Sequence, residues 1–176
     1  LRTERERRWI GNTFSQYLSP ELVAELKRNP TLLYLGGTTR EMTILFSDVR
    51  GFTTRSEKMT PAEVTRFINR FLTPMTRIVH ETQGTIDKYI GDAVMAFWGA
   101  PLHHPHHADL AVGAGLAMLK ALDELNLSFA QKGWPEVHIG VGINTGMMSV
   151  GNMGSRFRRA YTVLGDAVNL GSRLEG

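Results

Sequence analysis

The feature that most restricts the fold is the segment TIDKYIGDAVMAFWG, residues 85–99, which reads as two short strands joined at Gly91 and Asp92. A two-residue connection of this kind is a tight hairpin turn, so the two strands must be antiparallel neighbours in one sheet. Another apolar strand, residues 42–48, precedes the hairpin and is separated from it by a long helical pattern. The sequence therefore predicts a sheet that combines a hairpin with a strand connected through helices.

The helical pattern before the hairpin has clear ends. Thr60 stands at the N-cap position, Pro61 at the first helical position and Gly84 at the expected stop. Between them, apolar residues recur three, four and seven positions apart, which is the spacing of one buried helix face. Pro74 lies inside this pattern, and we expect it to kink the helix or to split it in two.

The remaining segments continue the alternation of strands and helices. A short helix is expected between Ser19 and Pro30, and GGTTR after it is expected to be a linker. Further helices are expected over residues 108–125 and 167–175, and further strands over residues 137–146, 147–152 and 159–166. The order βααββαβ is that of an α+β, ferredoxin-like fold, a split βαβ sheet with helices on one face.

Composition narrows the class of protein. The chain has 176 residues, 42% hydrophobic and 21% charged, which is typical of one ordinary globular domain with a substantial core. It has no apolar run of about 18 residues, the length that a membrane span requires. The absence of cysteine excludes disulfides and thiolate metal sites. The net charge of +3 is spread along the chain, so nucleic-acid binding is not expected, whereas a small polyphosphate ligand fits.

Two carboxylates are the first candidates for a functional site. Asp48 ends the apolar strand and Asp92 occupies the hairpin turn, and in a sheet of this order the two positions can fall at the same edge. Paired carboxylates without a cysteine or histidine set suit Mg²⁺ or Mn²⁺. The alternative is that Asp92 only forms the turn and Asp48 only caps the strand. Gly51 permits a close backbone approach that could bind a phosphate, or it belongs to an ordinary strand-to-helix turn.

Two other groups of polar residues have both a functional and a structural interpretation. Asn169 and Arg173 are four positions apart and share a helix face, where the arginine could stabilise a phosphoryl group, although a solvated helix face has the same pattern. The run His103–His107 lacks the spacing of a chelating helix, so we expect a loop there and no metal.

Four segments in order resemble the class III nucleotide cyclase catalytic domain: FSDVRGFT, DKYIGDAVMAFWG, GINTGMMSVGNMGS and YTVLGDAVNLGSRLEG. The resemblance runs from about Phe14 to Gly176. It implies an adenylate cyclase that converts ATP to 3′,5′-cyclic AMP and pyrophosphate. It also divides the chain into the end of an upstream linker or signalling helix (1–13), a short helix and linker (14–40) and the catalytic domain (41–176), with further C-terminal elements expected beyond it.

The resemblance also implies a role for each candidate residue. Asp48, Asp92 and the carbonyl of Val49 match the ligands of two divalent cations per site, Mg²⁺ or Mn²⁺. Gly51, Phe52 and Thr53 match a turn whose amides bind the phosphates. Lys88 and Thr162 match the pair that selects adenine, and a threonine at the second position resembles the class IIIb subgroup. Asn169 matches a ribose-orienting asparagine and Arg173 an arginine that stabilises the transition state.

The same resemblance implies a head-to-tail homodimer with shared active sites. Asp48 and Asp92 would serve one side of each site, and Lys88, Thr162, Asn169 and Arg173 of the other protomer would complete it. Met147 stands where some relatives carry a phosphate-binding arginine. An upstream sensor module and a cytoplasmic location in a membrane-anchored bacterial protein are further expectations. The alternatives are a guanylate cyclase of the same fold and a catalytically silent nucleotide-binding signalling domain.

Overall fold

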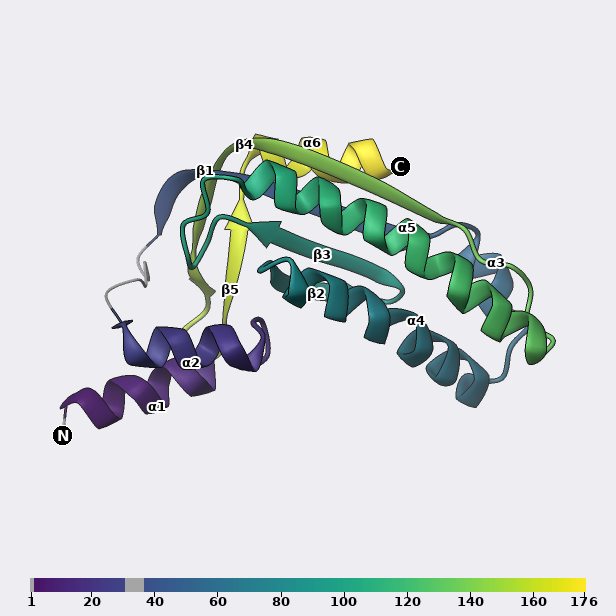
Figure 1. Ribbon diagram of the computed structural model, residues 1–176, viewed down its shortest axis with the longest axis horizontal. Helices are drawn as coiled ribbons and strands as arrows, with labels where there is room; N and C mark the ends of the chain where they lie inside the picture. Colours follow the sequence, from purple (N-terminus) through teal and green to yellow (C-terminus); the bar gives the residue numbers. More distant parts are fainter. Residues whose placement is uncertain (1, 31–36) are drawn as a thin grey trace.

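The computed structural model describes residues 2–30 and 37–176 (Figure 1). Its helices are α1 (Arg2–Phe14), α2 (Pro20–Arg28), α3 (Phe52–Ser56), α4 (Pro61–Glu81), α5 (His107–Gln131) and α6 (Asp166–Glu175). Its strands are β1 (Thr38–Val49), β2 (Thr85–Ile90), β3 (Ala93–Trp98), β4 (Ile139–Gly154) and β5 (Arg159–Leu164). Within this part of the chain, no helix has both the length and the apolar composition needed to cross a membrane.

The strands form one sheet in the order β2-β3-β1-β4-β5, and each neighbouring pair is antiparallel. The predicted hairpin is confirmed, because Ile90 pairs with Ala93 across the turn and Gly91 has a φ of 62°. Glycine reaches this left-handed region without the steric cost that a side chain imposes. The central strand β1 lies between β3 and β4; its ladder with β3 ends at Ser47, and its last residues, Asp48 and Val49, pair with Gly140 and Ile139 of β4.

Strand β4 differs from the prediction of two separate strands over residues 137–146 and 147–152. It is one continuous strand of 16 residues that pairs with β1 from Thr38 to Val49. The predicted boundary between the two strands fell after Gly146, but Gly146 pairs with Met42 in the regular ladder. The expected linker at residues 36–40 is also wrong for Thr38–Arg40, which begin β1, while Gly36 lies outside the described residues.

Helix α4 bears out its predicted start and stays continuous. Thr60 and Glu63 form a reciprocal capping box, in which each side chain accepts a hydrogen bond from the other residue's backbone N–H. Pro74 lies inside the helix without splitting it, so the predicted division in two is wrong. Helix α5 begins one residue earlier than predicted and extends to Gln131, because the apolar face continues to the buried Phe129.

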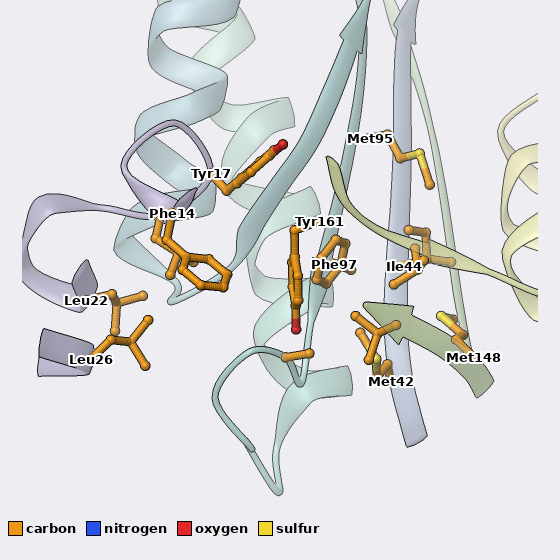
Figure 2. Packing of buried hydrophobic residues seen from close by; sticks show 14 of the residues in the cluster. Phe14, Tyr17, Leu22, Leu26, Met42, Ile44, Met95, Phe97, Met148 and Tyr161 are labelled. Atoms are coloured by element: carbon orange, nitrogen blue, oxygen red, sulfur yellow. The ribbon is translucent and has the colours of Figure 1, made fainter. Parts of the chain in front are cut away.

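Helices cover both faces of the sheet, which corrects the expectation that they lie on one face. Helices α4 and α5 pack on one face, where Leu45 and Val49 of β1 join the core around Phe67. The other face packs against α1, α2 and α6, as Figure 2 shows for Phe14 and Tyr161. These helices are needed because alternate residues of β1, such as Met42 and Ile44, are apolar on that face too. The α+β class is confirmed.

The N-terminal segment contacts both outermost strands of the sheet, β5 and β2. The ring of Phe14 stands edge-on to Tyr161 of β5, with centroids 5.1 Å apart. Beyond α1, the carbonyl of Tyr17 accepts a hydrogen bond from the backbone N–H of Ile86 in β2, at 3.0 Å. The first turns of α1 are exposed, as expected for its charged sequence, whereas Ile10 in its last turn is buried.

Helix α6 packs on β4 through glycines. A Cβ on Gly142 would collide with backbone atoms of Gly171 and Glu175, and a Cβ on Gly146 would come within 2.9 Å of the Ala167 side chain. A Cβ on Gly171 would lie 2.7 Å from Ile44. Helix and strand therefore meet backbone to backbone, which fixes the position of every residue on α6.

We predict that Gly142→Ala lowers the free energy of unfolding by about 1–3 kcal/mol, because the new methyl group meets the α6 backbone, which has no rotamer to adjust. Chemical denaturation measures the change. Gly113→Ala is the matched control: its Cβ has open space on α5, and alanine in a helix is expected to stabilise by about 0.5–1 kcal/mol. Equal effects of the two substitutions would contradict the close packing of α6.

Candidate active site

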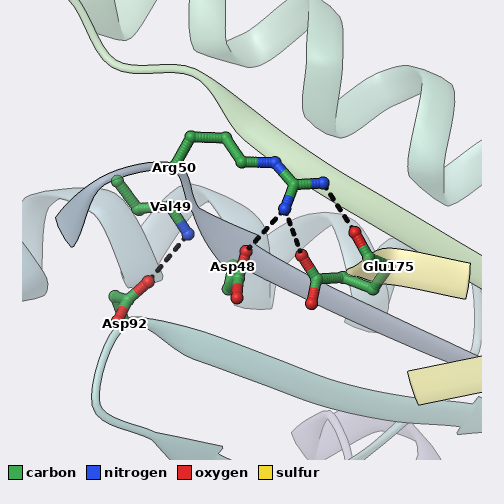
Figure 3. A network of polar contacts seen from close by, with 5 residues as sticks. All are labelled: Asp48, Val49, Arg50, Asp92 and Glu175. Carbon is green, nitrogen blue, oxygen red and sulfur yellow. Dashed lines mark hydrogen bonds and ion pairs between the residues drawn. The ribbon is translucent and has the colours of Figure 1, made fainter. Parts of the chain in front are cut away.

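The two predicted acidic residues lie at the same edge of the sheet. Asp48 continues the row of alternate β1 residues that face α6, and Asp92 lies in the turn after β2. The backbone N–H of Val49 donates a hydrogen bond to Asp92 Oδ2 at 2.7 Å, as Figure 3 shows. This bond ties the hairpin turn to the end of β1, so the expectation that the two positions meet at one edge is confirmed.

Sequence reasoning missed a second pair of charged residues at this edge. The Arg50 guanidinium lies 3.9 Å from Asp48 Oδ1 and 3.2 Å from Glu175 Oε1 (Figure 3). It also donates a hydrogen bond to the Glu175 backbone carbonyl at 2.6 Å. Arg50 can lie there because Gly140 of β4 has no side chain, and a Cβ at that position would overlap the guanidinium. The glycine at position 140 was the available signal for this arrangement. It could be interpreted only once the strand register had placed Gly140 opposite Asp48.

Three carboxylates are therefore close together, and the pKa values of Asp92 and Glu175 are raised. Burial raises the pKa of Asp92, the hydrogen bond from Val49 opposes this shift, and the charge of Asp48 adds to it. The pKa of Glu175 is raised to about 7, chiefly by burial and further by the nearby Asp48, while Arg50 acts in the opposite direction. Only 13% of the Glu175 side chain is exposed. The edge therefore has an excess of negative charge that a cation would relieve.

The donor set fits a hard divalent cation. Asp48 and Asp92 supply carboxylate oxygens and Val49 a backbone carbonyl, which are the kinds of ligand that Mg²⁺ and Mn²⁺ prefer. Among the residues that the structure describes, no group of three or more His, Cys, Asp or Glu side chains could hold a metal ion. The candidate site thus depends on two carboxylates and backbone oxygen. Within the histidine run at residues 103–107, His107 is buried and its Nδ1 is hydrogen-bonded to Thr43 Oγ1.

The turn after Asp48 begins the short helix α3. Gly51 is its N-cap, with a φ of 67°, and its carbonyl accepts a hydrogen bond from the Arg55 N–H. The ring of Phe52 stacks on Phe67, with centroids 5.9 Å apart. The first N–H groups of a helix have no partner within it, so those of Phe52 and Thr53 are available to an anion.

Lys88 lies on β2 and Thr162 on β5, the two outermost strands of the sheet, and both contact one buried carboxylate. Thr162 Oγ1 on β5 donates a hydrogen bond to Asp87 Oδ2 at 2.6 Å, and Lys88 Nζ lies 3.6 Å from Asp87 Oδ1. Burial raises the pKa of Asp87, while the hydrogen bond from Thr162 and the charge of Lys88 lower it. Sequence reasoning missed Asp87, because an acid beside a lysine on a strand normally points to the opposite face.

Asn169 and Arg173 lie on the exposed side of α6, which confirms that they share a helix face. The opposite side of the helix buries Val168 and Gly171. No hydrogen bond or ion pair among the described residues joins Asn169, Arg173, Lys88 or Thr162 to Asp48 or Asp92. Within one chain, these four residues are therefore not joined to the two acids.

The charge balance at Arg50 gives a testable prediction. Glu175, with its pKa raised above the unfolded value, stabilises the fold while protonated, and this contribution is lost as the pH rises from about 4.5 to about 7. Arg50 offsets the loss, so we expect Arg50→Gln to destabilise the protein by about 1 kcal/mol at pH 8.5 and by less at pH 5.5. Urea denaturation at both pH values, without divalent cations, measures this.

Arg66→Gln is the control, because Arg66 is exposed on α4 and its substitution removes the same charge at a different place in the fold. A loss at Arg50 that is the same at both pH values would show that Glu175 does not share its ion pair.

Known proteins resemble this chain over nearly all of its length. The family model described as the adenylate and guanylate cyclase catalytic domain matches residues 37–176. An adenylate cyclase from Anabaena cylindrica is 38% identical over 96% of this chain and 32% of its own length. Adenylate cyclase 1 from Rhizobium meliloti is 36% identical over 93% of this chain and 25% of its own length. The chain thus spans about a quarter to a third of these relatives.

Solved structures agree. The adenylyl cyclase CyaB from P. aeruginosa has a TM-score of 0.78 and 40% identity, over 80% of this chain and 74% of that one. The guanylyl cyclase Cya2 has a TM-score of 0.77 and 41% identity, over 80% of this chain and 72% of that one. The sheet edge that carries Asp48 and Asp92, the fold around it and these similarities lead to one conclusion: the chain belongs to the family of adenylate and guanylate cyclase catalytic domains.

Proposed function

We propose that this domain is an adenylate cyclase that converts ATP to 3′,5′-cyclic AMP and pyrophosphate. The observation that carries the proposal is the hydrogen bond from Val49 N–H to Asp92, which holds the turn carboxylate beside the one that ends β1. Asp48, Asp92 and the Val49 carbonyl would hold two divalent cations. When bound, these lower the pKa of the ribose 3′-hydroxyl and neutralise the triphosphate.

The chain's own residues would bind and orient the nucleotide. The amides of Phe52 and Thr53, after Gly51, would hold phosphate oxygens. The 3′-oxygen attacks the α-phosphorus in line as the bond to the pyrophosphate oxygen breaks, and the hydroxyl proton leaves to solvent. Asn169 would orient the ribose, and Arg173 would stabilise the charge that develops on the α-phosphoryl group.

We further propose that two copies of the chain assemble head to tail and complete each other's sites. The separation of the candidate residues into two sets supports this, because one chain alone does not bring them together. Exposed apolar side chains lie beside both sets: Ile90 is 59% exposed, Leu164 58% and Leu174 55%. Apolar side chains exposed beside an incomplete site are what a subunit interface leaves on a single chain.

The choice of ATP rests on Lys88 and Thr162. Overall similarity does not decide it, because an adenylyl and a guanylyl cyclase structure have nearly equal identity to this chain. Lys88 can only donate, which suits adenine N1, and Thr162 can accept from the exocyclic amine. An upstream sensor and anchoring to the inner side of a membrane remain predictions about sequence outside this chain.

The direct test is product formation. The protein is incubated with ATP or GTP under Mg²⁺ and under Mn²⁺, and both cyclic nucleotides are quantified. We expect cyclic AMP to exceed cyclic GMP with either cation, and chelation of the cation to abolish both. An excess of cyclic GMP would make the domain a guanylate cyclase and overturn the assignment of Lys88 and Thr162.

Complementation tests the shared site. Asp48→Ala and Lys88→Ala are each expected to be inactive alone, because each homodimer has two defective sites. In a mixture, half of the dimers are mixed and each has one intact site, so we expect about a quarter of the wild-type activity to return.

Lys120→Ala, an exposed lysine on α5, is the control and is expected to retain activity alone. If mixed dimers form, as shown by pull-down with two tags, and activity does not return, the shared-site proposal is wrong.

A further inference from the structure

We propose that Asp87 is a positioning residue that sets the base preference of this domain by fixing the direction of the Thr162 hydroxyl. The inference rests on the function proposed above and adds a residue to it. Asp87 is only 5% exposed, so it does not reach the nucleotide itself. Its influence must therefore act through the two side chains that touch it, Thr162 and Lys88.

A β-bulge brings these groups together. In the β2–β3 ladder, Ile86 pairs with Ala96 and Lys88 pairs with Met95, so Asp87 is the extra residue. In a regular strand, Asp87 and Lys88 would point to opposite faces. The bulge allows both side chains to turn to the same side, which is why residues adjacent in sequence lie 3.6 Å apart at their charged ends. Bulges commonly redirect a side chain next to a functional site.

The hydrogen bond between Thr162 and Asp87 has one direction. A carboxylate only accepts, so the Thr162 hydroxyl must donate its single proton to Asp87 Oδ2. At 2.6 Å it is in the range of short, charge-assisted hydrogen bonds. The other oxygen, Oδ1, is buried with no hydrogen-bond partner and faces Lys88. One oxygen thus accepts from Thr162 and the other faces Lys88, and the backbone of Val163 also hydrogen-bonds the carboxylate.

This direction restricts what Thr162 can offer a purine. Once its proton is committed to Asp87, only the oxygen lone pairs remain, so Thr162 becomes an acceptor. Lys88 is a donor without lone pairs. The pair then matches adenine, whose N1 accepts and whose exocyclic amine donates. Guanine in the same placement would set its N1–H against the ammonium and its O6 against the Thr162 lone pairs, which repels at both positions.

Asp87→Asn removes the constraint with little change in shape. The variant has one oxygen, and the Lys88 ammonium is expected to attract it to the position of Oδ1. The amide NH₂ then faces Thr162, whose oxygen must accept from it and whose proton turns toward the base. Thr162 can now donate to O6, so we expect the ratio of kcat/KM for ATP to that for GTP to fall by about tenfold or more.

The experiment measures this ratio in the wild type and in Asp87→Asn, each in three backgrounds: Thr162, Thr162→Ser and Thr162→Ala. If Asp87 acts through the hydroxyl, its substitution lowers the ratio in the first two backgrounds and has no further effect in the third. Displacement of a fluorescent nucleotide by ATP and by GTP gives the same comparison for binding alone. Asp123→Asn, an exposed acid on α5, is the matched control and is expected to leave the ratio unchanged.

The outcomes separate the two proposals. An unchanged ratio in Asp87→Asn, or an equal fall in the Thr162→Ala background, would overturn the role of Asp87 while leaving the cyclase proposal intact. A wild type that neither cyclises nor binds either nucleotide would overturn both, and that result needs no variant. If Asp87→Asn fails to fold, Asp87→Ser, which is smaller, uncharged and too short to reach Thr162, tests the same loss of the acceptor.

Discussion

One hydrogen bond holds the candidate active site together: the backbone N–H of Val49 donates to the carboxylate of Asp92. Val49 ends the central strand β1, where it continues the twelve-residue ladder with β4 by pairing with Ile139. The turn residue is thereby placed by the most constrained strand of the sheet and not by its own short hairpin. A site for small cations needs this, because hard cations bind well only when oxygen ligands are held within a fraction of an ångström.

The same constraint concentrates negative charge, and the fold compensates for it in two ways. Arg50 lies across Gly140 and contacts both Asp48 and Glu175, which offsets part of the repulsion. The pKa of Glu175 rises to about 7, so part of its negative charge is lost near neutrality. The stability of this edge is therefore coupled to pH, and the domain tolerates paired carboxylates that would be costly without a counter-charge.

Much of this arrangement followed from the sequence, because its signals were local. Gly91 and Asp92 marked the hairpin, Thr60 and Pro61 the start of α4, and Asp48 the end of a buried strand. The signals that failed depend on register or on contacts between distant segments. Gly146 was expected to end a strand, because its close approach to α6 has no trace in the neighbouring residues. Asp87 was not recognised as a neighbour of Lys88 and Thr162, since a one-residue bulge is invisible until β2 is aligned with β3.

The glycine contact between α6 and β4 has a mechanical consequence. Where two elements meet through side chains, rotamer changes absorb small displacements. Here the backbone of β4 at Gly142 lies directly against the backbone of α6 at Gly171, with no side chain between them that could change its rotamer. A push on α6 would accordingly shift Asn169, Arg173 and Glu175 as one rigid unit, so whatever disturbs the helix should switch all three together instead of weakening them one at a time.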